Sequence, residues 1–343
     1  MLVLDRASQS WRDDAFRDLP DLLTGNELLV VNNARVIPAR LFCRRAGIHA
    51  QAPGRHRPTR GEFLQAEIEV LLVRRLAPDR WQALVRPGRK VRSGERLLFG
   101  EGLEAEVIGR GEFGLRELRF TAEGNLEQSI ERVGHIPLPP YIHRPDEPRD
   151  RERYQTIFAR AGAAAAAPTA GLHFSTAILE RLRHKGVDLV ELTLEVGLGT
   201  FQPIHTERVE NHKIHRETYE IPAATAAAIA RARRERRPVI AVGTTVVRAL
   251  EDAALKYEGA RGKPAAEGEP ALEAGRAEAD LYIYPGHRFR VVDQMITNFH
   301  LPRSSLLVMV AAFAGREFLL DAYRYAVGAG YRFYSYGDCM WIR

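Results

Sequence analysis

A short histidine-rich segment, NHKIHRE, carries the side chains best suited to proton transfer. It contains His212, His215 and Glu217, and an imidazole beside a carboxylate exchanges protons near neutral pH or binds a substrate. The same residue types also serve as metal ligands, although their spacing does not match the HExxH motif of zinc enzymes. From the residues alone, acid–base chemistry or substrate binding is the first hypothesis, a structural role the second and a metal site the third.

The segment GTTVVR predicts an anion-binding site at the start of a helix. Gly243 is followed by Thr244 and Thr245, and Arg248 lies one turn further along the expected helix. Backbone N–H groups at a helix N-terminus favour negative charge, and the hydroxyls and the guanidinium add donors. N-capping of the helix explains the two threonines, but it does not explain why glycine, the threonines and an arginine occur together. We therefore expect the carboxylate of an amino acid or a phosphate to bind here.

Two turns that contain glycine are further candidates for ligand binding. In APTAGLHF, Thr169 and Gly171 open a turn before His173, and in GLGT a glycine pair precedes Thr200. Glycine lets a ligand approach the backbone closely, but the second segment lacks the third glycine of a dinucleotide fingerprint. The alternatives are a hydrogen-bonded structural histidine at His173 and a plain turn at Gly199.

Two apolar stretches late in the chain contain isolated polar residues. Asn298 and His300 lie in ITNFHLP, and Asp338 lies in YSYGDCM. Buried polar groups need hydrogen-bond partners. Each of the three is therefore either a structural node or part of a site.

All of these segments are expected near the ends of strands in an α/β domain. Helices are expected over 176–185, 223–237, 244–255 and 316–327, and strands over 187–197 and 238–242. Strands that alternate with helices indicate a largely parallel sheet or open barrel. Folds of this class bind ligands where their strands end.

A β-rich segment interrupts this pattern. Short strand-like runs recur between Phe63 and Phe120 with turn signals between them, which indicates a small antiparallel β-barrel or sandwich. A proline-rich linker follows over 135–153. The apolar run over 28–31 suits a strand of the α/β domain, so the β-rich part is predicted to be inserted. The predicted division is a main domain over 1–58 and 152–343 and an inserted domain over 59–151.

Composition places the chain among globular proteins. Hydrophobic residues make up 45% and charged residues 27% of the 343 residues, which excludes a disordered, collagen-like or disulfide-framed chain. Cys43 and Cys339 lie far apart and outside any CxxC pair, which favours a reducing compartment and no cysteine-ligated metal. No signal peptide is visible, and the longest apolar run, 306–314, is half of the roughly 20 residues that cross a bilayer. We expect a cytoplasmic protein without a membrane partner.

The charge of the chain is a weak sign of a nucleic-acid partner. Fifty basic and 44 acidic residues give a net charge of +6, which is small for this length. Its distribution is more informative, because residues 35–60 contain seven arginines and no acidic residue. This stretch is either a solvated loop or a surface that contacts phosphates.

Eight segments, taken in order, resemble the S-adenosylmethionine:tRNA ribosyltransferase-isomerase family of queuosine biosynthesis. They are VNNARVIPARL, YQTIFAR, APTAGLHFS, VGLGTFQP, ENHKIHRETYEI, VGTTVVRALE, YPGHRFRVVDQMITNFHLPRSSLL and YRFYSYGDCM. The likeness spans Leu2 to Met340. Each segment alone is a weak signal, whereas all eight in this order are highly specific.

The resemblance implies an α/β-barrel-like main domain with an inserted small antiparallel β-barrel domain. It also implies that the ribosyl part of S-adenosylmethionine is transferred to the aminomethyl group of 7-aminomethyl-7-deazaguanine at the wobble position of a tRNA. Isomerisation then gives epoxyqueuosine, with release of adenine and methionine. S-adenosylmethionine is thus a consumed co-substrate, and the resemblance implies no cofactor and no metal. We expect a monomer.

The resemblance and the chemistry of a sulfonium together suggest roles for the matching residues. A sulfonium acidifies the adjacent ribose 5′ carbon, so His173 or His215 is expected to remove that proton, with Glu217 orienting or protonating. The expected catalytic residues are His173, His215, Glu217 and Asp338. The expected substrate-binding residues are Thr169, Gly171, Gly199, Thr200, His212, Thr244, Thr245, Arg248, Asn298 and His300. The expected tRNA contacts are Arg35, Arg40 and Arg234.

The sequence departs from the family pattern in three places. Family members usually carry a further N-terminal segment before the strand seen here as LVLDR. Either the start codon is misassigned or the N-terminus is lost, and substrate contacts in that segment cannot be carried over. The usual Gly-Ala-Val before the AAPTAG run is Ala163-Ala164-Ala165, and Cys339-Met340-Trp341 replaces a small residue followed by Met-Leu.

The alternative functions are an S-adenosylmethionine-dependent RNA methyltransferase and a non-catalytic RNA-binding protein.

Overall fold

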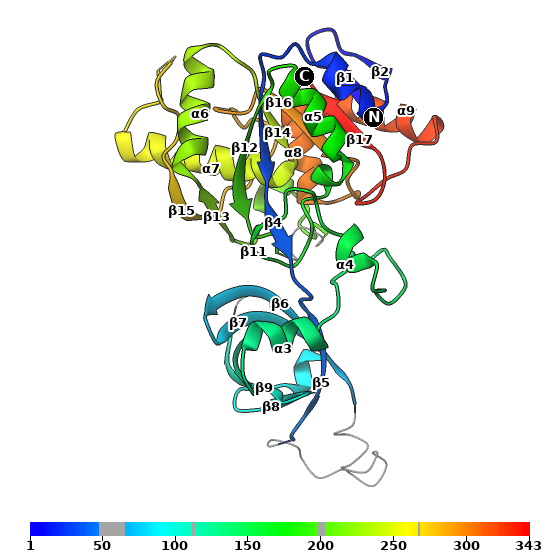
Figure 1. The fold of residues 1–343 in the computed structure, drawn as a ribbon, viewed down its shortest axis with the longest axis vertical. Coiled ribbons are helices and arrows are strands. Elements are labelled where there is room, and N and C mark those ends of the chain that lie inside the picture. Colours follow the sequence, from blue (N-terminus) through cyan, green and yellow to red (C-terminus); the bar gives the residue numbers. More distant parts are fainter. Residues whose placement is uncertain (48–65, 112–113, 198–202, 267) are drawn as a thin grey trace. The chain divides into compact units, whose positions relative to one another are not determined.

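The chain forms two compact units. The computed structural model describes residues 1–47, 66–111, 114–197, 203–266 and 268–343 (Figure 1). The first unit contains Met1–Arg35, Gln155–Gly162 and Ala167–Arg343, and the second contains Val36–Tyr154 and Ala163–Ala166. The chain passes between the units along β4 (Ala34–Val36) and β11 (Ala161–Ala164), which pair as a two-stranded sheet.

The first unit is built on a mixed sheet of nine strands. Their order is β15-β13-β12-β3-β14-β16-β17-β1-β2, with β15 and β2 as the two edges. The chain is therefore a mixed α/β protein, and the pairings of the described residues do not show the α/β-barrel form that the resemblance implies. The strands are β1 (Leu2–Asp5), β2 (Ser10–Asp13), β3 (Leu28–Asn32), β12 (Asp188–Leu194), β13 (Glu217–Ile221), β14 (Val239–Val242), β15 (Gly275–Ala279), β16 (Gln294–Asn298) and β17 (Cys339–Ile342).

The central strands β3 and β14 are buried along their whole lengths, as expected of strands that are covered on both faces. Side chains alternate between the two faces, so Leu29 and Val31 share one core with Ile178 and Leu182 of α5 (Thr176–His184). The opposite face of these strands packs against the long helix α7 (Thr244–Arg261). This packing fixes the start of α7 at the end of β14.

The structure confirms the expected helices and changes some of their ends. Helix α6 (Ala223–Arg234) is shorter than predicted, α9 (Arg316–Gly328) agrees closely, and α7 continues six residues beyond the predicted 255. The apolar run over 306–314 forms α8 (Ser305–Ala314). Within the described ranges, no helix combines the length and apolarity needed to cross a membrane. The shorter helices of this unit are η1 (Phe16–Asp18), α1 (Leu19–Leu22), η4 (Thr169–His173) and η6 (Val209–Asn211).

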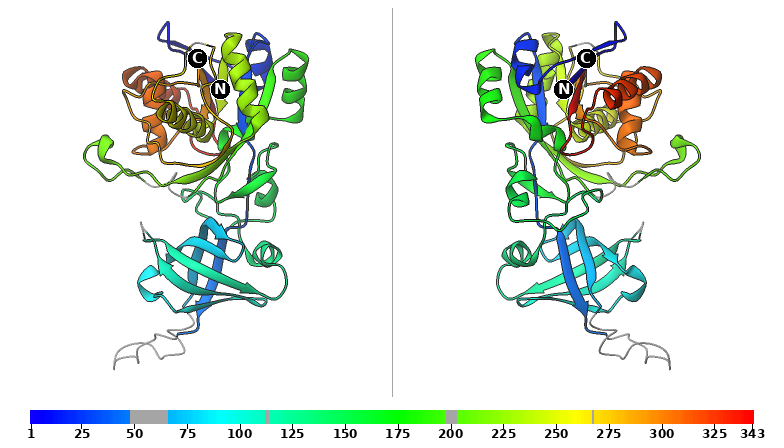
Figure 2. Two further views of the ribbon diagram at one scale, coloured as in Figure 1. Left: turned by 90° about the vertical axis from the view of Figure 1, so that its left-hand side faces the viewer. Right: turned by 90° about the vertical axis from the view of Figure 1, so that its right-hand side faces the viewer.

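The second unit contains a closed β-barrel (Figure 2). Its six strands are antiparallel and follow the order β10-β7-β6-β5-β8-β9. The predicted antiparallel β-barrel is thereby confirmed. Its interior is filled by alternate residues, such as Leu97 and Phe99 of β8. The strands are β5 (Arg40–Arg45), β6 (Ile68–Ala77), β7 (Arg80–Arg86), β8 (Arg96–Gly100), β9 (Leu103–Arg110) and β10 (Arg116–Ala122). Strand β5 thus pairs within the barrel, although the predicted division assigns residues up to 58 to the main domain.

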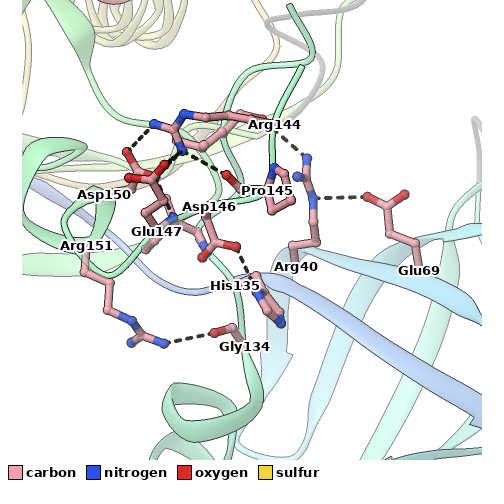
Figure 3. Close-up of polar contacts among 12 residues, drawn as sticks. Arg40, Glu69, Gly134, His135, Arg144, Pro145, Asp146, Glu147, Asp150 and Arg151 are labelled. Carbon is pink, nitrogen blue, oxygen red and sulfur yellow. Dashed lines mark hydrogen bonds and ion pairs between the residues drawn. The ribbon is translucent and has the colours of Figure 1, made fainter. Parts of the chain in front are cut away.

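The proline-rich segment belongs to the second unit and is held by side chains (Figure 3). Proline has no N–H group, so such a segment makes few backbone hydrogen bonds of its own. The Asp146 carboxylate accepts from the His135 ring at 2.8 Å and from the backbone N–H of Ile136 at 2.8 Å. The buried Asp150 carboxylate, at the start of α4 (Asp150–Arg153), accepts two hydrogen bonds from Arg144 at 2.6 and 2.9 Å.

The Asp150 pair predicts a pH-dependent contribution to stability. The hydrogen bonds from Arg144 hold the pKa of the Asp150 carboxyl below its ordinary value of 3.8, so the contribution is complete above that pH and is lost as the pH falls through the folded-state pKa. We expect Asp150→Asn to lower the free energy of unfolding by about 1–2 kcal/mol at pH 7. The deficit should shrink at pH 3 in urea unfolding, and Glu147→Gln on the same segment is the matched control. A deficit of equal size at both pH values would contradict this assignment.

Candidate functional site

Six neighbouring strands of the first unit bring polar residues to one edge of the sheet. Strands β12, β3, β14 and β16 are consecutive and parallel, so their carboxyl ends lie at the same edge. Strands β13 and β17 flank this group and run antiparallel to it, so their first residues lie at that edge too. Asn32, Thr244, Asn298, Glu217 and Asp338 therefore all lie along this edge. This is the edge at which α/β sheets bind ligands.

Asn298, at the end of β16, ties two of the predicted segments together. Its amide oxygen accepts from the Thr169 hydroxyl at 2.9 Å, and its amide nitrogen lies 3.2 Å from Nε2 of His173. The same nitrogen lies 3.3 Å from the carbonyl of Tyr334. The structure thus brings together Thr169, His173 and Asn298, which lie far apart in the sequence.

This arrangement fixes the hydrogen-bonding state of His173. Because the Asn298 amide nitrogen only donates, Nε2 of His173 is the acceptor and Nδ1 carries the proton. Burial lowers the pKa of His173 to about 4, so the ring is neutral near pH 7. His173 is therefore arranged as a hydrogen-bond donor, and its Nε2 lone pair is already engaged.

Arg248 and Glu217 form a buried ion pair. Arg248 Nη1 lies 2.5 Å from Glu217 Oε2, and both side chains are about 5% exposed. Arg248 also donates to the carbonyls of His215 at 2.6 Å, Ala279 at 2.8 Å and Leu281 at 3.1 Å. The second oxygen of Glu217 accepts from the N–H of Gly197 at 2.8 Å. The two charges neutralise each other and hold together the ends of β12, β13 and β15.

A pocket lies beside this ion pair. It is lined by His215 and Glu217, by Arg248 and the first residues of α7, and by the first residues of α8. The N-termini of α7 and α8 thus reach the same pocket, and each provides backbone N–H groups with partial positive charge. The full lining is Ile214, His215, Glu217, Thr244, Thr245, Arg248, Tyr282, Ile283, Ser305, Leu306 and Met309.

His215 is the histidine that lines this pocket. Burial lowers its pKa below the ordinary 6.5, Glu217 opposes that shift and the Arg248 guanidinium adds to it. The ring is therefore neutral near pH 7, which is the form that accepts a proton. Of the two histidines predicted as the base, His215 is the one that lines this pocket.

Several buried polar residues that the sequence analysis missed position the site. Asn32 donates from its amide to Leu194 O at 3.0 Å and to the Thr245 hydroxyl at 3.3 Å, which ties the ends of β3 and β12 to the start of α7. Glu251 is fully buried and accepts backbone N–H groups of the segment over 290–292. Asp252 accepts the N–H groups of residues 280 and 281 at 3.2 Å. The available signal was a charged R-x-x-E-D pattern on an otherwise apolar helix.

Three of the predicted substrate-binding residues make packing or hydrogen-bonding contacts within the first unit. A Cβ added to Gly171 would lie 2.9 Å from Cγ2 of Thr156, so this position requires glycine for close packing. The His212 ring packs edge-on against Tyr282 at 5.3 Å. Nε2 of His300 lies 2.7 Å from the Thr297 hydroxyl, and burial lowers the pKa of His300 to about 4.

Asp338 caps its own loop, since its carboxylate accepts from the N–H of Arg332 at 2.8 Å. Gly199 and Thr200 lie outside the described residues.

The three arginines predicted to contact tRNA differ in their surroundings. Arg35 and Arg234 are exposed. Arg40 lies 3.1 Å from Glu69 in an ion pair and also donates to Leu138 O, so its charge is already compensated within the second unit (Figure 3). Residues 48–60 of the arginine-rich stretch lie outside the described part of the chain.

The residues that were considered as metal ligands do not form a metal site. Across the described ranges, no group of three or more histidine, cysteine or carboxylate side chains is arranged to hold a metal ion. Cys43 and Cys339 are both buried and free.

Comparisons with known proteins give a consistent result. A family model described as queuosine biosynthesis protein matches residues 1–342. An S-adenosylmethionine:tRNA ribosyltransferase-isomerase of Solibacter usitatus is 54% identical over 344 residues, covering 100% of this chain and 92% of the relative. The protein of the same name from Syntrophotalea carbinolica is 48% identical with the same coverage. A crystal structure of an S-adenosylmethionine tRNA ribosyltransferase from Thermotoga maritima is 34% identical, covers 100% of this chain and 91% of that chain, and has a TM-score of 0.49.

Proposed function

Because this chain belongs to the S-adenosylmethionine:tRNA ribosyltransferase-isomerase family of queuosine biosynthesis, we propose that its active site is the sheet edge described above. The chain uses S-adenosylmethionine and tRNA in a transfer and isomerisation reaction. One observation supports the proposed site: His215 and Glu217 line a pocket at this edge that the N-termini of α7 and α8 also reach. The residue roles below are part of this proposal.

The methionine part of S-adenosylmethionine binds between the N-termini of α7 and α8. Thr244, Thr245 and Ser305 line the pocket at these two helix starts, where a carboxylate is stabilised by N–H groups and helix dipoles. The Arg248 guanidinium is neutralised by Glu217, so it organises the pocket and contributes little net charge to ligand binding.

His215 acts as the base that removes a proton from the ribose 5′ carbon next to the sulfonium. Its neutral ring at the pocket wall supports this role. Glu217 orients the segment that carries His215 through their shared partner Arg248. The proton moves from carbon to the ring nitrogen, and the sulfonium stabilises the electron pair that is left behind.

His173 serves as a donor to the ribose or to the departing adenine. The hydrogen bond from Asn298 leaves Nδ1–H as the donor of the ring. Asn298 contacts that ring and is itself held by the Thr169 hydroxyl, and Asp338 lies at the same edge just before β17. The acceptor is 7-aminomethyl-7-deazaguanine in the tRNA, and Arg35 and Arg234 are candidate phosphate contacts.

Release of free adenine tests the proposed function. Incubation with S-adenosylmethionine and a tRNA that carries the aminomethyl-deazaguanine should give adenine and methionine together with ribosylated tRNA. The same tRNA with guanine at the wobble position is the matched control and should give none. Release of S-adenosylhomocysteine would indicate a methyltransferase, and binding of tRNA without any product would indicate a non-catalytic protein. Either outcome would overturn the proposal.

A further inference from the structure

The segment that joins β15 to β16 brings a tyrosine, Tyr282, to the pocket wall. The preceding residue, Leu281, is held on both sides of its peptide, since its N–H donates to Asp252 at 3.2 Å and its carbonyl accepts from Arg248 at 3.1 Å. The Tyr282 ring lies 5.3 Å from the ring of His212 and 5.6 Å from that of Tyr284. These four contacts, two of them from α7, hold Tyr282 and the residue before it in place.

The Tyr282 hydroxyl is buried and lacks a hydrogen-bond partner among the described residues. A buried hydroxyl without a partner is costly, and such groups in native proteins mark strain or a site for a ligand. Tyr282 lines the pocket together with Thr244, Thr245 and Ser305. The residue that carries the unsatisfied hydroxyl is therefore part of the wall of the cavity in which a substrate is proposed to bind.

The chemistry of the pocket indicates what would satisfy this hydroxyl. Burial raises the pKa of Tyr282 to about 12, with Glu210 and Tyr284 adding to the shift, so the phenol stays protonated and donates. The helix starts beside it also offer donors, and the one carboxylate of the lining, Glu217, is already bound by Arg248 and by the N–H of Gly197. A ligand group that accepts hydrogen bonds and carries negative charge fits this set.

We propose that the Tyr282 hydroxyl donates a hydrogen bond to the amino-acid carboxylate of bound S-adenosylmethionine. This inference rests on the proposed function and adds a substrate-contacting residue to it. Tyr282 then selects for the carboxylate, since the helix N-termini supply diffuse positive charge and the phenol supplies one directed donor.

The test compares S-adenosylmethionine with its decarboxylated analogue, which lacks only the carboxylate. Tyr282→Phe should raise the Kd of S-adenosylmethionine by about tenfold, as expected for a lost hydrogen bond to a charged group, and leave the Kd of the analogue unchanged in calorimetry. The melting temperature of the unliganded variant should equal or exceed that of the parent, because the substitution removes an unsatisfied buried group. Tyr284→Phe on the same segment is the matched control, since Tyr284 is exposed, and it should alter neither affinity.

Two outcomes would overturn the inference. Equal weakening of both ligands would show that the hydroxyl does not contact the carboxylate. A lower melting temperature with unchanged affinity for S-adenosylmethionine would show that the hydroxyl has a structural partner instead. Adenine release by the parent protein is measured separately, so failure of the proposed function is distinguishable from failure of this contact.

Discussion

Replacing Arg248 by methionine is expected to lower the free energy of unfolding by about 3–5 kcal/mol. Methionine keeps most of the length of the side chain but removes the charge, which leaves the Glu217 carboxylate buried without its counter-ion. The carbonyls of His215, Ala279 and Leu281 would also lose their donor. The loss should therefore exceed that of an ordinary surface ion pair, which is worth about 0–1 kcal/mol.

Urea unfolding of the single and double variants measures this effect. Arg248→Met combined with Glu217→Gln removes both charges, so the double variant should be more stable than Arg248→Met alone. A single variant as stable as the parent protein would contradict the prediction. A double variant that is less stable by the sum of the two single effects would show that the ion pair contributes no coupling.

Replacing His215 by alanine is expected to reduce turnover by about 10²–10⁴-fold, the range that a general base contributes. Because the pKa of His215 is lowered from 6.5 by burial, the neutral ring persists below that pH. The parent enzyme should therefore keep its turnover from neutral pH to below 6.5 and lose it only at more acidic values. In the variant this acidic decline should disappear from the residual rate.

Adenine release measured from pH 5 to 8 under saturating S-adenosylmethionine tests this role. His184→Ala is the matched control, because His184 is exposed on α5 and should leave turnover unchanged. Unchanged turnover in His215→Ala would remove this residue as the base. His173 would then be the remaining candidate for the base, and its Nε2 would have to lose the hydrogen bond from Asn298 to accept the proton.

Local patterns predicted the parts of the site that depend on local structure. The glycine-threonine segment before Arg248 predicted the start of α7, and the alternation of strands and helices predicted that the polar clusters meet where strands end. The β-rich segment predicted the barrel for the same reason, since its strands pair mostly with their neighbours in sequence.

Contacts between distant segments could not be predicted in the same way. The partner of helical Arg248 is Glu217, which lies 31 positions earlier at the start of β13, and no spacing rule connects them. Asn32 directly follows the apolar run over 28–31, and nothing near it in the sequence indicates that its side chain donates to the carbonyl of residue 194. His173 and His215 looked equivalent as bases. The structure distinguishes them, because His215 lines the pocket and Nε2 of His173 accepts the hydrogen bond from Asn298.

The position of β3 in the sheet has a consequence for how the chain folds. Its neighbours on both sides, β12 and β14, begin at residues 188 and 239, so β3 leaves the ribosome long before either partner exists. The barrel strands lie between residues 40 and 122 and can pair during this interval. Pairing between strands so far apart in the sequence is slow. Until it occurs, the apolar strand β3 is unpaired and exposed. If the inserted barrel folds early, much of the chain that separates β3 from β12 and β14 in the sequence is already compact. The flexible loop that must close before β3 can pair is then shorter.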